Sequence, residues 1–190
     1  MGFLKNVFGG RSDPPKANLD NLFAVPGAAV TLEVASGFKP TGVASVCYRA
    51  AEGGAFATTQ DDVQQLLDSD AGPAVERSTD SFGFTWLVCR RDPSELSELV
   101  TEVHAVNSSL ENAGFGPSLL CSVVGFHDAA GRRLALVYLY KQGTFYPFAP
   151  LDGERRDNAL EIQARGVLTD DLPLESELGR WMALWGAPGL

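Results

Sequence analysis

The strongest hydrophobic pattern in the chain lies between residues 82 and 150. Apolar residues occupy nearly consecutive positions in three runs, at residues 82–90, 119–126 and 134–140. Such runs are typical of strands with apolar side chains on both faces. Between the first two runs, apolar residues recur at intervals of three and four, which predicts a long amphipathic helix. The order strand, helix, strand, strand therefore predicts a buried antiparallel core.

The capping residues predict where the long helix begins and ends. Asp92 is the expected N-cap, Pro93 suits the first helical position, and Glu95 completes a capping box. Gly114 is expected to end the helix. The predicted inward stripe of this helix consists of Leu96, Leu99, Val100, Val103, Asn107 and Leu110.

Weaker patterns extend the fold on both sides of this core. A turn at residues 128–131 predicts a hairpin between the last two apolar runs. The other predicted helices cover residues 26–36, 60–68, 155–166 and 175–184, and the other predicted strands cover residues 43–49, 56–59, 76–79 and 144–148. Together they predict an α+β fold with a single antiparallel sheet of about five to six strands and helices mainly on one face.

Residues 1–17 are predicted to be a short amphipathic helix and a proline-rich linker, separate from a single domain at residues 18–190. Four apolar residues have helical spacing, namely Phe3, Leu4, Val7 and Phe8. A helix of about ten residues is not stable alone in water. We therefore expect this segment to pack on its own domain, to dock on a partner or to insert weakly into a membrane interface.

The composition is that of a globular protein with an acidic surface. Apolar residues make up 45% and charged residues 21%, which is enough apolar material for a core. The net charge of −9 disfavours nucleic acid as a partner, because phosphate contacts need clustered Lys and Arg. No apolar stretch approaches the roughly 20 residues that span a bilayer, and no secretory signal is expected. We expect a cytoplasmic protein with at most weak peripheral membrane contact.

Candidate catalytic residues are few. Cys47, Cys89 and Cys121 are odd in number and widely spaced, which favours buried free thiols. His127 and Cys121 fall on one predicted strand, roughly 20 Å apart, which is too far for a nucleophile and its base. No phosphate-binding glycine loop and no metal-ligand motif occurs. We therefore predict no catalytic residue, no cofactor and no metal site.

Two other functions stay open at this stage. A hydrolase or transferase with an unrecognised site would use Cys121, His127 or Arg155. A small-ligand sensor would have a cavity lined by Tyr138, Tyr140 and Phe148.

Two surface features are candidates for partner contact. Arg155 and Arg156 open a predicted helix beside an aromatic strand and would suit an acidic partner or a lipid headgroup, and the simpler explanation is a solvated helix start. Trp181 and Trp185 lie at helical spacing and are expected to pin the last helix to the core.

Several longer strings give the whole chain a family resemblance. They are residues 1–4 (MGFL), 38–42 (FKPTG), 54–57 (GAFA), 85–88 (TWLV), 104–111 (HAVNSSLE), 143–150 (GTFYPFAP), 154–161 (ERRDNALE) and 185–190 (WGAPGL). On these strings the chain resembles the PspA-associated PspAB family of actinobacteria. The resemblance implies an accessory of the phage-shock envelope-stress system, with a PspA-like protein and often an HtpX-type membrane protease as partners. It implies no catalytic residues.

The order of elements is also similar to that of YbjN and type III secretion chaperone domains, which are dimeric and non-catalytic. We therefore expect a non-enzymatic adaptor or chaperone-like module of the PspA-type membrane stress response, and a homodimer is a further expectation. Under this hypothesis the contact residues are Phe3, Leu4, Val7, Phe8, Arg155 and Arg156.

Overall fold

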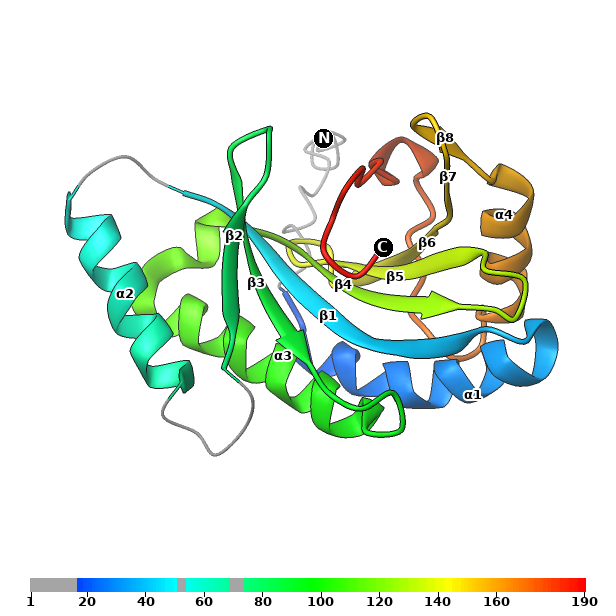
Figure 1. Cartoon of the computed structure of the whole chain (residues 1–190), viewed down its shortest axis with the longest axis horizontal. Helices are drawn as coiled ribbons and strands as arrows, with labels where there is room; N and C mark the ends of the chain where they lie inside the picture. Colours follow the sequence, from blue (N-terminus) through cyan, green and yellow to red (C-terminus); the bar gives the residue numbers. More distant parts are fainter. Residues whose placement is uncertain (1–16, 51–53, 69–73) are drawn as a thin grey trace, which may run out of the picture.

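A six-stranded antiparallel sheet organises the chain (Figure 1). The computed structural model describes residues 17–50, 54–68 and 74–190. The strand order is β2-β3-β1-β4-β5-β6. The strands are β1 (Lys39–Arg49), β2 (Glu76–Thr79), β3 (Phe84–Arg90), β4 (Leu119–His127), β5 (Arg133–Leu139) and β6 (Thr144–Phe148), followed by a separate hairpin of β7 (Pro150–Leu151) and β8 (Arg155–Arg156). The predicted α+β class and the antiparallel sheet are confirmed.

Helices precede, interrupt and follow the sheet in the chain. A 3₁₀ turn, η1 (Leu19–Ala24), runs directly into α1 (Val25–Ser36). The other α-helices are α2 (Gly54–Asp68), α3 (Leu96–Leu110) and α4 (Asn158–Val167). Figure 1 shows α1 and α3 side by side beneath the sheet, with α4 at one end and α2 beyond the β2 edge.

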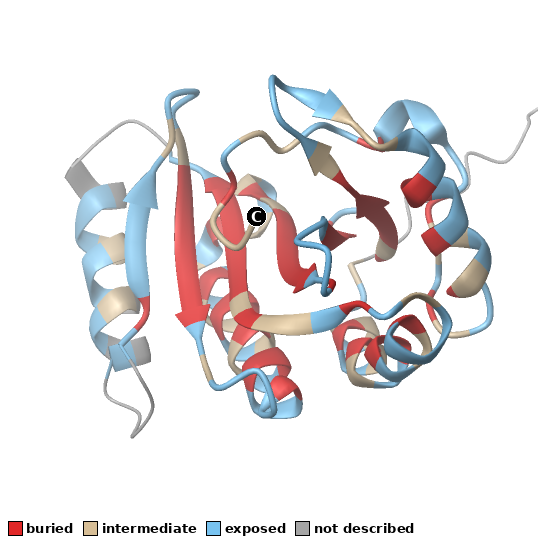
Figure 2. Cartoon of the chain, turned by 45° about the vertical axis from the view of Figure 1, so that its right-hand side comes forward, coloured by how far each residue is buried: buried red, intermediate tan, exposed pale blue. Residues whose placement is uncertain are grey.

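Both faces of the central strands are buried, as the continuous apolar runs predict. Along β5, Leu136 and Tyr138 face one core, and Val137 and Leu139 face another. The first core lies against α1, α3 and α4, which contribute Leu32, Leu99 and Leu160. The second core lies under the C-terminal segment, residues 173–190, which contributes Trp181 and Ala187. Figure 2 shows the buried strands enclosed between these two covers.

The long helix matches the predicted stripe, but its start is shifted. Each predicted stripe residue is buried, and so is Val106. Asp92 does not cap α3, because its carboxylate accepts hydrogen bonds from Ser94 N and Ser94 Oγ. Glu95 occupies the N-cap position, and its carboxylate accepts from Asp92 N at 3.3 Å. The predicted capping residues therefore build a turn before α3.

Two predicted elements are wrong. Residues 56–59 belong to α2 and not to a strand, because the helical pattern that begins at residue 60 extends back to Gly54. The predicted helix at residues 175–184 is reduced to a 3₁₀ turn at Leu178–Arg180. Its start is extended, because Glu175 N donates to Phe145 O at 2.7 Å, and Phe145 N donates to Pro173 O at 2.8 Å. These bonds add the chain to the free edge of β6.

The C-terminal segment crosses β4 at Gly125. A Cβ on Gly125 would collide with the carbonyl of Gly189 and lie 2.8 Å from Thr41 Oγ1. The neighbouring Ser45 Oγ donates a hydrogen bond to Pro188 O at 3.1 Å. Only a residue without a side chain lets the backbone of this segment lie against the sheet.

We predict that Gly125→Ala lowers the free energy of unfolding by about 1–3 kcal/mol, because overpacking displaces the C-terminal segment. The control is Gly166→Ala in α4, where a Cβ would meet nothing within 4 Å. This control should change stability by no more than about 1 kcal/mol. Urea denaturation followed by tryptophan fluorescence measures both, and equal stabilities would contradict the proposed crossing.

Candidate binding groove

The C-terminal segment is held on the sheet by side chains of the strands and of β8. Tyr146 OH donates to Met182 O at 2.9 Å, and Arg156 Nη1 donates to Trp181 O at 2.6 Å. The Trp181 indole donates to Glu175 O at 3.1 Å and stacks on the Tyr146 ring. Because this segment has little regular secondary structure, these bonds satisfy backbone carbonyls that a helix would satisfy internally.

A buried ion pair between Arg156 and Glu161 joins the C-terminal segment to α4. Arg156 Nε donates to both carboxylate oxygens of Glu161, at 2.9 and 3.2 Å. The Glu161 side chain is only 4% exposed and also accepts from Ala149 N at 3.0 Å. The Arg156 guanidinium lies over the Phe148 ring, 5.1 Å from its centroid. Arg156 therefore links β8, α4 and the C-terminal segment.

A groove opens where this cover ends. It has a volume of about 430 Å³ and lies between the β2–β3 turn, the β7–β8 hairpin and the C-terminal residues. Its lining comprises Ser81, Phe82, Arg133, Pro150, Leu151, Asp152, Gly153, Glu154, Leu184, Trp185, Gly186 and Leu190. Phe82 is 66% exposed and Leu151 39% exposed. The groove is therefore partly apolar, and two of its large apolar side chains are open to solvent.

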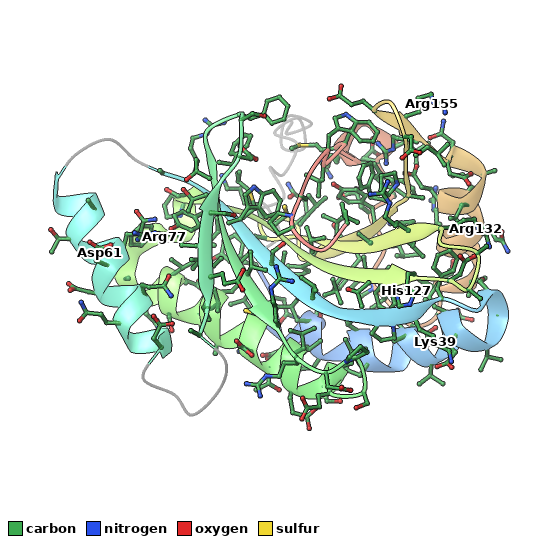
Figure 3. The ribbon with its side chains drawn as sticks, viewed as in Figure 1. Lys39, Asp61, Arg77, His127, Arg132 and Arg155 are labelled. Atoms are coloured by element: carbon green, nitrogen blue, oxygen red, sulfur yellow. The ribbon has the colours of Figure 1, made fainter. Side chains whose placement is uncertain are left out.

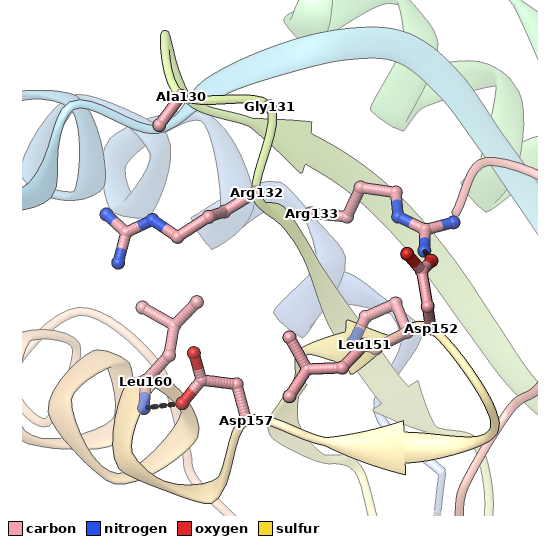
Figure 4. Close-up of a pocket in the computed structure, with 9 residues that line it drawn as sticks. Ala130, Gly131, Arg132, Arg133, Leu151, Asp152, Asp157 and Leu160 are labelled. Carbon is pink, nitrogen blue, oxygen red and sulfur yellow. Dashed lines mark hydrogen bonds and ion pairs between the residues drawn. The ribbon is translucent and has the colours of Figure 1, made fainter.

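An adjoining hollow of about 170 Å³ continues from the groove towards α4 (Figure 4). The two share Arg133, Pro150, Leu151 and Asp152. Figure 4 shows the Arg133 side chain pointing towards Asp152, and the two charged groups are 3.7 Å apart. Both side chains are exposed, so this pair contributes little stability and its charges are available to a partner.

Asp80 positions Phe82 on the rim of the groove. Its carboxylate accepts hydrogen bonds from Phe82 N, Phe84 N and Trp86 Nε1, each at 2.9 Å. Partial burial acts to raise the pKa of Asp80, but the hydrogen bonds from Trp86, Phe84 and Phe82 outweigh burial and lower this pKa. The ionised carboxylate is thus part of the turn that presents Phe82.

Arg155 and Arg156, the two arginines predicted to contact a partner, have different surroundings. Arg155 is exposed, donates to Asp152 O at 3.1 Å, and lies at the periphery of the molecule (Figure 3). Arg156 is largely covered and engaged with Glu161 and Trp181. Arg155 is therefore open to a partner near the groove, whereas Arg156 holds the fold together. Phe3, Leu4, Val7 and Phe8 lie outside the described residues.

The structure does not bring together the residues that a hydrolase or transferase would use, namely Cys121, His127 and Arg155. Cys121 is buried opposite Cys47, its register partner on β1, and His127 lies at the exposed end of β4. Figure 3 shows His127 well separated from Arg155. A hydrogen bond with Cys121, together with burial, raises the pKa of the Cys47 thiol, which disfavours a reactive thiolate there.

The alternative of a ligand cavity lined by Tyr138, Tyr140 and Phe148 is contradicted by the structure. Tyr138 and Tyr140 belong to the core beneath the helices, whereas Phe148 belongs to the core beneath the C-terminal segment. Tyr138 and Phe148 are therefore separated by the sheet and cannot line one cavity.

In the described part of the chain, no group of three or more His, Cys, Asp or Glu side chains converges on a metal position. Within the same ranges, no helix is long and apolar enough to cross a bilayer.

Sequence patterns did not predict the groove. Its lining comes from four parts of the chain, at residues 81–82, 133, 150–154 and 184–190, and local patterns do not show that these parts meet. A usable signal was Phe82, an aromatic residue inside the turn sequence Asp80-Ser81-Phe82-Gly83. An apolar side chain at a turn is exposed unless another segment covers it.

Comparisons with known proteins give one match. The family model PspAB, described as PspA associated protein B, matches residues 1–189. No curated protein and no solved structure matches the chain. The similarity in topology to YbjN and type III secretion chaperones therefore stays a prediction.

We predict that Arg156→Met lowers the free energy of unfolding by about 2–4 kcal/mol, because it leaves the buried Glu161 carboxylate without its charged partner. The double variant Arg156→Met/Glu161→Gln should recover much of this loss, since glutamine still accepts from Ala149 N. Arg155→Met is the matched neighbour and should change stability by less than about 0.5 kcal/mol. Chemical denaturation checks all three, and equal losses at residues 155 and 156 would contradict the assignment.

We predict a pH dependence from Asp80. Because its folded pKa is lowered, its contribution is present above the unfolded pKa of about 3.9 and is lost as pH falls through the folded pKa. Asp80→Asn should lower stability at pH 7, and its difference from the wild type should shrink as pH falls below about 4. Urea titrations between pH 3 and 7 measure this difference. A difference that stays constant with pH would show that the charge of Asp80 has no role.

Proposed function

The chain belongs to the PspAB family, PspA associated protein B, and on that premise we propose that it is a non-enzymatic adaptor or chaperone-like module that binds a PspA-like protein. The family match over residues 1–189 is the observation that carries this proposal. The family name supports association with PspA, and the adaptor role is our inference from the surface of the domain.

The groove supports binding to a protein surface. Phe82, Leu151 and Trp185 offer apolar contacts on segments held by hydrogen bonds. Asp152, Glu154 and Arg155 surround them with charges of both signs. An apolar centre with a polar rim is the usual anatomy of a protein interface. The net charge of −9 keeps the domain soluble while this surface stays open.

The proposal includes the N-terminal segment as a second contact. Phe3, Leu4, Val7 and Phe8 would add apolar area, and a weak membrane contact would hold the protein near a membrane-bound partner. We accordingly propose that the protein acts in the cytoplasm at the inner face of the plasma membrane, in the response to envelope stress. An HtpX-type protease is a further proposed partner.

No observation favours the competing functions. A hydrolase based on Cys121 and His127 would need the two side chains to converge, and they lie far apart on β4. A ligand sensor based on Tyr138 and Phe148 would need one shared cavity, and the sheet separates them.

We predict that the full-length protein binds the purified PspA-like protein of the same host, and that Phe82→Asp/Leu151→Asp weakens this binding at least about tenfold. The reason is that charges at these two positions oppose burial of the groove against a partner. Ile162→Asp places the same charge at an exposed apolar residue on α4, away from the groove lining, and should bind as the wild type does. Biolayer interferometry with immobilised partner measures the affinities.

A further variant, Phe3→Asp/Val7→Asp in the full chain, separates the two contacts. If this variant binds more weakly while Phe82→Asp/Leu151→Asp binds as the wild type does, the contact is made by the N-terminal segment. The adaptor hypothesis itself fails if the wild-type protein shows no affinity for the PspA-like protein.

A further inference from the structure

Two of the three cysteines face each other across neighbouring strands. Cys47 on β1 and Cys121 on β4 are register partners in an antiparallel ladder, and both belong to the core beneath the C-terminal segment. Cys89 on β3 belongs to the other core, beneath the helices. All three are free thiols, as the sequence predicts, but only the strand register brings two of them together.

The geometry of this pair suits a disulfide. Residues directly opposite each other in an antiparallel pair have Cα atoms about 4.5–5.5 Å apart, which lies within the range of about 4.4–6.8 Å that a disulfide spans. The thiols are also in contact, because a hydrogen bond with Cys121 is the main cause that raises the pKa of Cys47. A covalent bond between the two sulfur atoms therefore needs no rearrangement of the strands.

The C-terminal segment keeps oxidants away from this pair. Cys47 is 3% and Cys121 6% exposed. Ser45 lies two residues before Cys47 on the same face of β1, and its Oγ donates to Pro188 O at 3.1 Å, so the segment lies directly beside the thiols (Figure 1). The other face of the sheet is closed by α1, α3 and α4. A reagent therefore reaches the pair only when the C-terminal segment lifts.

This segment is the part of the fold best suited to lift. Its described helical structure is limited to the 3₁₀ turn at Leu178–Arg180. Single hydrogen bonds from Ser45, Tyr146 and Arg156 hold its backbone on the sheet. Segments of this kind open at a lower free energy than the central strands of a core. Opening of the cover therefore exposes the thiols while β1 and β4 stay paired.

We propose that Cys47 and Cys121 are a thiol switch, which closes to a disulfide across β1 and β4 when the C-terminal segment lifts in the presence of a hydroperoxide. In the first step the oxygen–oxygen bond of the peroxide breaks, Cys121 becomes a sulfenic acid, and water or an alcohol leaves. In the second step the Cys47 sulfur bonds to the Cys121 sulfur, and the hydroxyl leaves with the Cys47 proton as water. The two thiols are oxidised by two electrons and the peroxide is reduced.

The order of the two steps follows from the surroundings of the thiols. The raised pKa of Cys47 disfavours its thiolate, so Cys121 is the thiol that meets the peroxide first. Cys47 is already in contact and completes the bond. In the reducing cytoplasm proposed for this protein, a disulfide is transient and suited to sensing. A dithiol reductant reverses it, and the switch needs neither the groove nor a PspA-like partner.

Peroxide treatment of the reduced full-length protein tests the switch. After exposure to hydrogen peroxide, the protein is denatured in N-ethylmaleimide, which labels the remaining thiols. Intact mass and peptide mapping should show one disulfide between Cys47 and Cys121 and a label on Cys89. Dithiothreitol should restore three free thiols, and Cys121→Ser should form no disulfide.

Matched variants test whether the cover controls the reaction. Gly125→Ala displaces the C-terminal segment and should accelerate disulfide formation at least about fivefold, because oxidation follows the population of the open form. Gly166→Ala on α4 and Cys89→Ser on the other face should both react at the wild-type rate. Circular dichroism confirms that each variant is folded.

The other outcomes contradict the proposal. Three free thiols after prolonged peroxide treatment, or a disulfide that links two copies of the chain, would show that the pair does not close. Oxidation of Cys89 as fast as that of Cys121 would show that the whole domain opens and that the pair has no reactivity of its own. Equal rates in the wild type and in Gly125→Ala would show that the cover does not control the reaction.

Discussion

The whole structure depends on the fact that its central strands are apolar on both faces. The sheet therefore needs two covers, because either face left in water would cost the burial that stabilises the fold. The first cover is regular, since α1, α3 and α4 present apolar sides to the strands. The second is the C-terminal segment, whose backbone needs polar partners that it cannot supply itself. Ser45, Tyr146 and Arg156 provide them.

This irregular cover also shapes the surface. It protects the strands at Trp181 and Ala187 and then ends beside the β7–β8 hairpin, so Trp185 and Leu190 line a groove. The groove is consequently coupled to the stability of the cover: the Arg156–Glu161 pair that fixes Trp181 also fixes the hairpin and the start of α4. A surface feature and a core feature thus share the same interactions.

The regular half of the fold was predictable from the sequence, and the irregular half was not. The helix stripe from Leu96 to Leu110 has strong local periodicity, and the hairpin between β4 and β5 consists of two continuous apolar runs joined by turn residues. The type of each element therefore follows from the local pattern. The C-terminal segment has no such period. Its position depends on contacts with distant residues, such as the crossing of Gly189 over Gly125, which local patterns do not contain. The candidate groove was missed for the same reason, whereas the exposure of Arg155 agrees with its place in a polar stretch.

The exposed apolar side chains of the groove are held in place by the fold. Phe82 lies on a turn that Asp80 ties to β3, and Leu151 lies on β7, which pairs with β8 in a separate hairpin. The groove is therefore present before any partner arrives. Such preorganisation lowers the entropic cost of binding. The geometry therefore suits the groove to an external partner.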